Sequence, residues 1–149
     1  MTSVLNGNQT TEERVRDLHN ANYNRGRVYP TLAAGVSVAS ANADWTLGTV
    51  TEVVPANTIT TAYHVSLVSI EACDENAVYE LAVYYGASDT LMCTIRFAVS
   101  GGFFGNQLYL LPSVKIPANS RLRMALASSN GAGAVGTIAV SVVYRLLSG

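Results

Sequence analysis

The chain has 149 residues, of which 49% are hydrophobic and 13% are charged, with a net charge of −1 and a single lysine, Lys115. This length suits one domain, and the apolar content argues against disorder over most of the chain. Soluble domains are usually about 25% charged. A chain so poor in charge is more typical of an obligate oligomer or a lattice component, because permanent interfaces are more apolar than free surfaces.

Residues 1–28 differ from the rest of the chain and are expected to form an N-terminal arm. Thr10 or Thr11 can cap a short helix, which would place Glu12 and Glu13 in its first turn. Neither a secretory signal nor a membrane-spanning segment is expected from the sequence. The arm contains four arginines, which are candidate interface residues: Arg14, Arg16, Arg25 and Arg27.

Residues 29–149 are expected to form one β domain. Eight apolar or alternating runs are separated by turn-forming residues. These runs cover residues 32–39, 45–54, 59–73, 78–85, 91–99, 108–111, 121–127 and 137–147. The third run is long enough for one strand with a bulge or for two strands. No helical pattern separates the runs, so the sequence predicts an all-β fold, a jelly-roll-like antiparallel β-sandwich of about eight strands.

One short phrase occurs twice, as Pro-Ala-Asn followed by a hydroxyl residue at 55–58 and again at 117–120. Proline fixes φ, and asparagine and hydroxyl side chains favour turns, so each copy is expected to end one extended segment and start another. A loop that enters a strand and a duplicated Greek-key half are both compatible with this repeat. We interpret the repeat as a structural joint that the chain uses twice.

Charge is sorted along the chain. Residues 31–95 contain seven acids and no base, whereas residues 96–149 contain five bases and no acid. The two segments either neutralise each other within one sandwich or pair head-to-tail between subunits, with Arg121 and Arg123 as candidate interface residues. The five bases are dispersed and lack interleaved aromatic residues, so no nucleic-acid partner is expected.

Two groups of aromatic residues are open to two interpretations each. Phe103 and Phe104 lie between glycines, and they either plug the end of a sheet or anchor in a pocket of a partner, which makes them candidate interface residues. Tyr79, Tyr84 and Tyr85 either form a structural ladder within a sheet or a platform on which sugar rings stack.

The motif-like features do not indicate catalysis. Glycines at 131, 133 and 136 formally match the dinucleotide fingerprint, but a β run follows them instead of a helix, so a hairpin loop is predicted. His64 can be combined with Glu71 or Asp74 and a serine, yet no nucleophile elbow, metal motif or carboxylate pair accompanies it. We therefore expect no enzyme activity, no catalytic residue and no cofactor.

Cys73 and Cys93 are the only cysteines in the chain. Cys93 is in phase with Leu91, Ile95 and Phe97, which predicts a buried thiol. A disulfide between the two cysteines is left open, because the sequence does not provide its geometry. No histidine lies at ligand spacing from them, so a zinc site is not expected.

Six phrases stand out between residues 29 and 147: Tyr29-Pro-Thr-Leu-Ala-Ala, Trp45-Thr-Leu-Gly, Val54-Pro-Ala-Asn, Tyr79-Glu-Leu-Ala-Val-Tyr-Tyr-Gly, Ile116-Pro-Ala-Asn-Ser-Arg and Leu126-Ala-Ser-Ser-Asn. In combination they resemble the capsid decoration (cement) proteins of tailed bacteriophages. The resemblance implies a jelly-roll-like body, made in the host cytoplasm and seated as homotrimers on the outer capsid surface. It also implies that the protein bridges subunits of the major capsid protein, and it offers no catalytic residues.

The first functional hypothesis is therefore a non-enzymatic phage virion protein that associates with itself and with the major capsid protein, without nucleic acid or membrane. The alternative is a receptor- or glycan-binding module of a tail fibre or baseplate, with aromatic rings such as Tyr84 and Tyr85 facing solvent. The complete set of candidate interface residues is Arg14, Arg16, Arg25, Arg27, Tyr29, Phe103, Phe104, Arg121 and Arg123.

Overall fold

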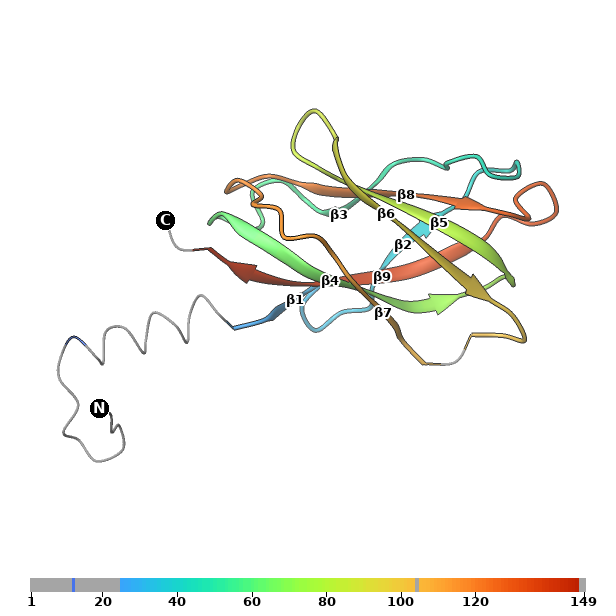
Figure 1. Ribbon diagram of the computed structural model, residues 1–149, viewed down its shortest axis with the longest axis horizontal. Helices are drawn as coiled ribbons and strands as arrows, with labels where there is room; N and C mark the ends of the chain where they lie inside the picture. Colours follow the sequence, from blue (N-terminus) through green and yellow to red (C-terminus); the bar gives the residue numbers. More distant parts are fainter. Residues whose placement is uncertain (1–11, 13–24, 104, 148–149) are drawn as a thin grey trace.

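Two antiparallel sheets pack face to face in the computed structural model, which describes residues 12, 25–103 and 105–147 (Figure 1). Sheet I has the order β1-β9-β4-β7, with β2 also paired to β9, and sheet II has the order β3-β8-β5-β6. The strands of sheet I are β1 (Arg27–Tyr29), β2 (Val36–Ala39), β4 (Tyr63–Cys73), β7 (Gln107–Leu110) and β9 (Thr137–Leu146). The strands of sheet II are β3 (Thr51–Val54), β5 (Ala77–Tyr85), β6 (Thr90–Val99) and β8 (Leu122–Ser128).

The predicted all-β sandwich is confirmed, with nine strands where about eight were expected. The additional strand is β1, which pairs with β9 from Arg27 onward. No helix occurs in residues 25–103 and 105–147, and the predicted helix of the arm, including Arg14 and Arg16, falls outside the described part of the chain apart from Glu12. The division into an arm and a β domain at residues 28 and 29 stays a prediction.

The long apolar run at 59–73 forms one strand, β4, and not two. Its pairing with β9 shifts register twice, between Val65 and Leu67 and between Ile70 and Ala72. Each shift is a bulge that adds one residue to β4 and bends the strand. The bulges keep Val68 and Ile70 in the core while the strand follows the twist of its partner.

The core lies between the sheets and takes alternate residues from each strand. Tyr79, Leu81 and Val83 of β5 have no exposed surface, so they share the inward side of the strand. The prediction for Leu91 is wrong, because the pairing of β5 and β6 shifts register next to it and leaves its side chain 55% exposed. Cys93 packs against the core as a partly buried free thiol.

The predicted strand over 45–54 is wrong for its first half, since β3 contains only Thr51–Val54. Trp45 has a positive φ of 53°, and its amide and that of Gly48 donate to carbonyl oxygens along the edge of β8. A Cβ atom at Gly48 would collide with the carbonyl oxygen of Ala39, so only glycine permits this close approach. The segment is a loop tied to β8, although its composition is typical of a strand.

The glycine-rich segment between β8 and β9 is not a hairpin, and that prediction is wrong. The two strands belong to different sheets, so the loop crosses from sheet II to sheet I. Asn130 starts a tight turn, in which the carbonyl oxygen of Asn130 accepts hydrogen bonds from the amides of Gly133 and Ala134. A strand follows the loop, as predicted, so the segment lacks the helix that a dinucleotide site needs.

The two Pro-Ala-Asn phrases form matching turns that carry the chain between the sheets in opposite directions. In each turn the residue after asparagine donates its amide to the proline carbonyl at 3.3 Å, and Asn57 and Asn119 both have φ of 65°. The first turn leads from β3 in sheet II to β4 in sheet I. The second leads from Ile116, which bridges to Tyr63 of β4, to β8 in sheet II. The interpretation as a structural joint used twice is confirmed.

Candidate functional site

His64 is buried among structural neighbours and not among catalytic ones. It is 7% exposed on β4, and its Nδ1 lies 3.4 Å from the guanidinium of Arg145 on β9. Burial, and then the charge of Arg145, lower the pKa of His64 below its usual 6.5. Glu71 instead accepts the backbone amide of Gly35 at 3.1 Å. The histidine and the carboxylate are therefore not brought together as a catalytic pair.

The titratable side chains form no metal centre in the part of the chain that the structure describes, where no group of three or more His, Cys, Asp or Glu residues could hold an ion. Cys73 and Cys93 are both free thiols, and burial raises the pKa of the Cys93 thiol. Within the same residues, no helix has the length and apolar character needed to cross a membrane.

Three ion pairs join the acidic and basic segments of the chain inside one molecule. Glu80 pairs with Arg96 across β5 and β6 at 2.7 Å. Asp89 pairs with both Arg121 and Arg123, at 3.4 and 3.0 Å. Each of these three pairs joins the acidic segment 31–95 to the basic segment 96–149. The pairs support the first of the two interpretations of the charge pattern, in which the segments interleave.

The candidate residues Arg121 and Arg123 lie at the end of sheet II, where they hold the loop between β5 and β6. The Arg121 guanidinium donates to the carbonyl oxygens of Gly86 and Ala87 as well as to Asp89. Arg123 donates to the carbonyl oxygen of Val50 in addition to Asp89. Both side chains are about three-quarters buried, so their contacts are chiefly internal.

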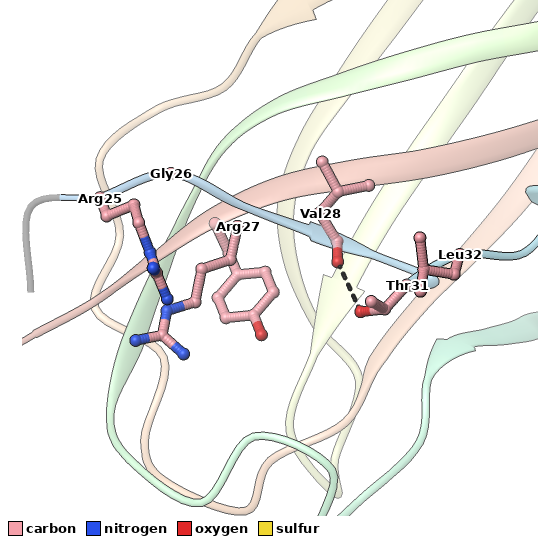
Figure 2. A pocket seen from close by; sticks show the side chains of 7 residues that line it. Arg25, Gly26, Arg27, Val28, Thr31 and Leu32 are labelled. Atoms are coloured by element: carbon pink, nitrogen blue, oxygen red, sulfur yellow. Dashed lines mark hydrogen bonds between the residues drawn. The ribbon is translucent and has the colours of Figure 1, made fainter. Parts of the chain in front are cut away.

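Arg25 and Arg27 line a depression of about 410 Å³ beside β1 (Figure 2). The side chains of both arginines lie on one side of β1 and the side chain of Val28 lies on the other side (Figure 2). Tyr144 of β9 also lines the depression. Thr31 closes the far end, where its hydroxyl donates to the carbonyl oxygen of Val28 at 3.1 Å. The candidate residues Arg25 and Arg27 are therefore neighbours, at the point where the chain enters the sandwich.

The other aromatic candidates are structural in the described part of the chain. Tyr29 and Phe103 both pack against the core, which supports the interpretation of Phe103 as a plug at a sheet end. Phe104 lies outside the described residues. Tyr84 lies on the outer side of β5, whereas Tyr85 packs inward, so the two rings do not share a solvent-facing platform. The glycan-binding alternative stays a prediction.

The outer face of sheet II carries charged side chains, although its outward alanines Ala82, Ala125 and Ala127 are buried. Its outward side chains include Glu52, Glu80, Arg96 and Arg123, one from each strand of the sheet. The half-exposed indole of Trp45 lies over Arg96, whose guanidinium carbon is 4.7 Å from the ring centroid. Charge, ion pairing and a cation–π contact make this face compatible with water.

The outer face of sheet I is different, and no sequence motif had indicated it. We call it the apolar face and define it by its outward side chains: Val28, Leu67, Ser69, Leu108, Leu110, Ala139, Ser141 and Val143. The strand register places Leu110, Leu67, Val143 and Val28 side by side in one row across β7, β4, β9 and β1. A second row contains Leu108, Ser69 and Ser141. None of the eight defining side chains carries a charge.

The apolar face is exposed along β7 and β1, whereas Ser69 and Ser141 at its centre are only 6% exposed. Leu110 is 84% exposed, Leu108 is 63% exposed and Val28 is 50% exposed. The alternation of Gln107-Leu108-Tyr109-Leu110 places both leucines on one side of β7, but it does not say which side meets the core. In the structure Tyr109 faces the core, with its ring centroid 5.8 Å from that of Phe97. Leu108 and Leu110 alternate with Tyr109 along β7, so their side chains point outward.

No protein-family model and no curated protein sequence matches the chain. Similar solved structures come from infectious bursal disease virus. The structure of its Gx strain has 18% sequence identity and a TM-score of 0.42, covering 85% of this chain and 33% of that chain. Its VP2 subviral particle has 19% identity and a TM-score of 0.42, covering 83% and 33%. Its T13 viral particle has 17% identity and a TM-score of 0.39, covering 99% and 40%.

This chain spans 33% to 40% of the length of those viral proteins. With TM-scores below 0.5 and identities below 20%, the similarities assign no function to it. The functional conclusion rests on the surfaces of the protein itself.

Proposed function

We propose that this chain is a non-enzymatic structural protein of a phage virion. In this proposal it is a capsid decoration (cement) protein that associates with copies of itself and binds the major capsid protein on the outer surface of the shell. The homotrimer implied by the family resemblance is one form that this assembly can take. No enzyme activity, cofactor, nucleic acid or membrane forms part of the proposal.

The apolar face is the observation that carries the proposal. On the outer face of sheet I, three large apolar side chains, Val28, Leu108 and Leu110, are at least half exposed. Leu108 and Leu110 expose apolar surface that water penalises by about 25 cal/mol per Å². Such a face is typical of a surface that another protein covers. The low charge of the whole chain and the decoration-protein phrases support the same proposal.

A lattice gives weak contacts a large effect. A protein that binds only the assembled shell stabilises it in proportion to its occupancy, and contacts from many copies add up along the surface. A sandwich in which Arg121 and Arg123 pair internally with Asp89 suits this role because these charges do not need a partner on another molecule.

The location of the protein in purified particles tests the proposal. Virions from cells that carry the encoding genome should contain this chain in many copies by quantitative mass spectrometry. Gold-labelled antibodies against it should decorate the outer shell. Absence from purified particles would overturn the virion role, and labelling confined to the tail would overturn the decoration role.

The contribution of the arm is tested with shells that lack the protein. The full chain should bind such shells and co-sediment with them, and a variant without residues 1–24 should bind more weakly while its sandwich stays folded by circular dichroism. This variant removes the candidate residues Arg14 and Arg16 but keeps β1. Equal occupancy of the shells by both proteins would overturn the role assigned to the arm.

A further inference from the structure

We infer that copies of this chain associate head to tail, with the basic end of one sandwich against the acidic end of the next. The inference rests on the self-association in the proposed function but not on the virion role. It names two different surfaces and makes each the partner of the other.

The strand register defines the two ends of the sandwich. At the first end, Tyr63 at the start of β4 lies opposite Leu146 of β9, and Leu122 at the start of β8 lies opposite Tyr85 of β5. At the second end, the turn 74–76 joins β4 to β5 and the loop 129–136 joins β8 to β9. Both sheets therefore share the same two ends, the first at the left and the second at the right of Figure 1.

The first end is basic. Ile116 bridges to Tyr63 and brings Lys115 to this end, and Arg27 pairs with Tyr144 near the end of β9. Of the seven bases in residues 25–103 and 105–147, six lie at this end, together with two acids. The bases of this basic end are Arg25, Arg27, Lys115, Arg121, Arg123 and Arg145, and its acids are Glu52 and Asp89.

The second end is acidic. Asp74 accepts the amide of Thr137 at the start of β9 at 2.7 Å, and Asp44 accepts the amide of Ala132 at 2.9 Å. Four acids and no base lie here among residues 25–103 and 105–147. These acids of the acidic end are Asp44, Glu71, Asp74 and Glu75.

The internal ion pairs leave this separation of charge in place. Asp89 pairs with arginines of its own end, and the pair of Glu80 and Arg96 lies between the ends. Between the described residues no ion pair joins one end to the other. The side chains of the basic end thus sum to +4 and those of the acidic end to −4. Strands of about ten residues, at 3.3 Å each, hold these charges about 30 Å apart.

A second copy is the partner that this charge distribution favours. Complementary charges steer two surfaces together and select their orientation, and the acidic end of every copy complements the basic end of every other. Each end also exposes a large apolar side chain that the contact would cover, Leu91 at the basic end and Val135 at the acidic end. A contact between two different surfaces repeats from copy to copy, so it forms either a ring, such as a homotrimer, or an open row.

Sedimentation velocity of the purified full chain tests the inference. At about 50 mM salt the chain should form a concentration-dependent series that extends beyond the dimer. At about 0.5 M salt it should be monomeric, because salt screens the charges that join the ends.

Two variants test the two surfaces separately. Arg25→Glu/Lys115→Glu removes the charge of the basic end, and Glu75→Lys/Ala132→Lys removes most of the charge of the acidic end. Each variant alone should be monomeric, with a dissociation constant raised at least about 10-fold. An equimolar mixture should form a dimer and nothing larger, because each variant keeps the end that the other lacks.

The control is Thr94→Glu, at an exposed position on β6 between the two ends, which should associate like the wild type. All variants should keep their fold by circular dichroism, because Arg25, Lys115 and Ala132 are exposed and Glu75 is partly exposed.

Four results would overturn the inference. These are a wild-type chain that is monomeric at low salt, as expected if residues 1–24 cover the basic end, a wild-type series that stops at a dimer, association that salt does not weaken, and a mixture of the variants that stays monomeric. A monomeric chain that binds heparin would assign the basic end to a polyanion instead. The virion role is tested separately, by the location of the chain in particles.

Discussion

The backbone amide of Asn57 donates to the carbonyl oxygen of Asn119 at 3.0 Å, which joins the two copies of the repeated phrase directly. The amide of Asn119 in turn donates to the carbonyl oxygen of Ile59 at 2.8 Å. Each copy moves the chain from one sheet to the other, so the repeat forms a single corner of the sandwich. The hydroxyl of buried Tyr63 supports this corner by donating to the carbonyl oxygen of Ser120 at 2.9 Å.

The first prediction concerns the left-handed residues of this corner. Asn57→Ala and Asn119→Ala should each lower the free energy of unfolding by about 1 kcal/mol, because a φ of 65° suits asparagine but not alanine. The matched glycine variants should stay within about 0.5 kcal/mol of the wild type, since glycine adopts this conformation freely. Urea unfolding measures both. Alanine variants as stable as the glycine variants would contradict the assignment of the turns.

The second prediction concerns Asp89, the only acid that pairs with two arginines among the described residues. Asp89→Asn keeps a side chain that tolerates the positive φ of 52° but leaves Arg121 and Arg123 without their carboxylate. The free energy of unfolding should fall by about 1 to 2 kcal/mol. The control is Glu80→Gln, because its more exposed pair with Arg96 should contribute less than about 1 kcal/mol. An equal loss from both variants in urea unfolding would argue against this ranking.

The third prediction concerns the pH dependence of stability through His64. Its pKa is lowered in the folded protein by burial and by Arg145, so the unfolded chain binds the proton more tightly. The contribution of His64 is therefore constant above its usual pKa of 6.5 and turns unfavourable as the pH falls below that value. The slope from this one proton is at most about 1.4 kcal/mol per pH unit.

Unfolding in urea between pH 7.5 and pH 5 measures this effect. His64→Gln should flatten the fall in stability below pH 6.5, and Arg145→Gln should reduce it only in part, because burial is the larger cause of the shift. The second histidine, His19, is unchanged in both variants and provides an internal reference. A His64→Gln profile parallel to that of the wild type would exclude His64 as the source.

The fourth prediction concerns the contact of Gly136 with Tyr79. A Cβ atom at Gly136 would lie 2.5 Å from the Tyr79 hydroxyl oxygen, so Gly136→Ala should lower the free energy of unfolding by about 1 to 3 kcal/mol. Tyr79→Phe removes that oxygen and its 2.6 Å hydrogen bond to the carbonyl of Glu75, at a cost of about 1 kcal/mol.

The double variant tests the contact itself. Gly136→Ala combined with Tyr79→Phe should be more stable than the sum of the single losses predicts, because phenylalanine relieves the closest approach. The relief is partial, since a ring carbon of Tyr79 also lies 2.7 Å from the added atom. Strict additivity in urea unfolding would show that the collision is relieved elsewhere.

Strands with strict alternation were predictable from sequence because their local pattern decides their structure. In β5 the residues Tyr79, Leu81 and Val83 alternate with polar or small ones, and the structure buries them all. The loop after Trp45 was mispredicted because its β-type composition is overruled by distant contacts. Its path is set by hydrogen bonds to Leu126 and Ser128 of β8, about 80 residues further along the chain.

The candidate site was less predictable than the fold, for a geometric reason. Alternation reveals that Leu108 and Leu110 share a side of β7, but the side that meets the core depends on which sheet β7 joins. The candidates chosen for their chemistry, such as Arg121 and Phe103, make contacts within the fold, and their role at an interface stays a prediction. Charge and aromatic character marked these residues, whereas the apolar face is marked by exposed apolar side chains on strands that are far apart in sequence.

The positions of β8 and β9 in their sheets have a consequence for biosynthesis. These last two strands supply the only strand partners of β1, β2 and β3 among the described residues. While the ribosome is still making the chain, the first three strands therefore wait without a pairing edge until residues 122–146 have emerged. Folding of this kind depends on long-range contacts and is slow. The nascent chain is thus most vulnerable to aggregation and proteolysis until β8 and β9 have emerged, because neither sheet can close before then.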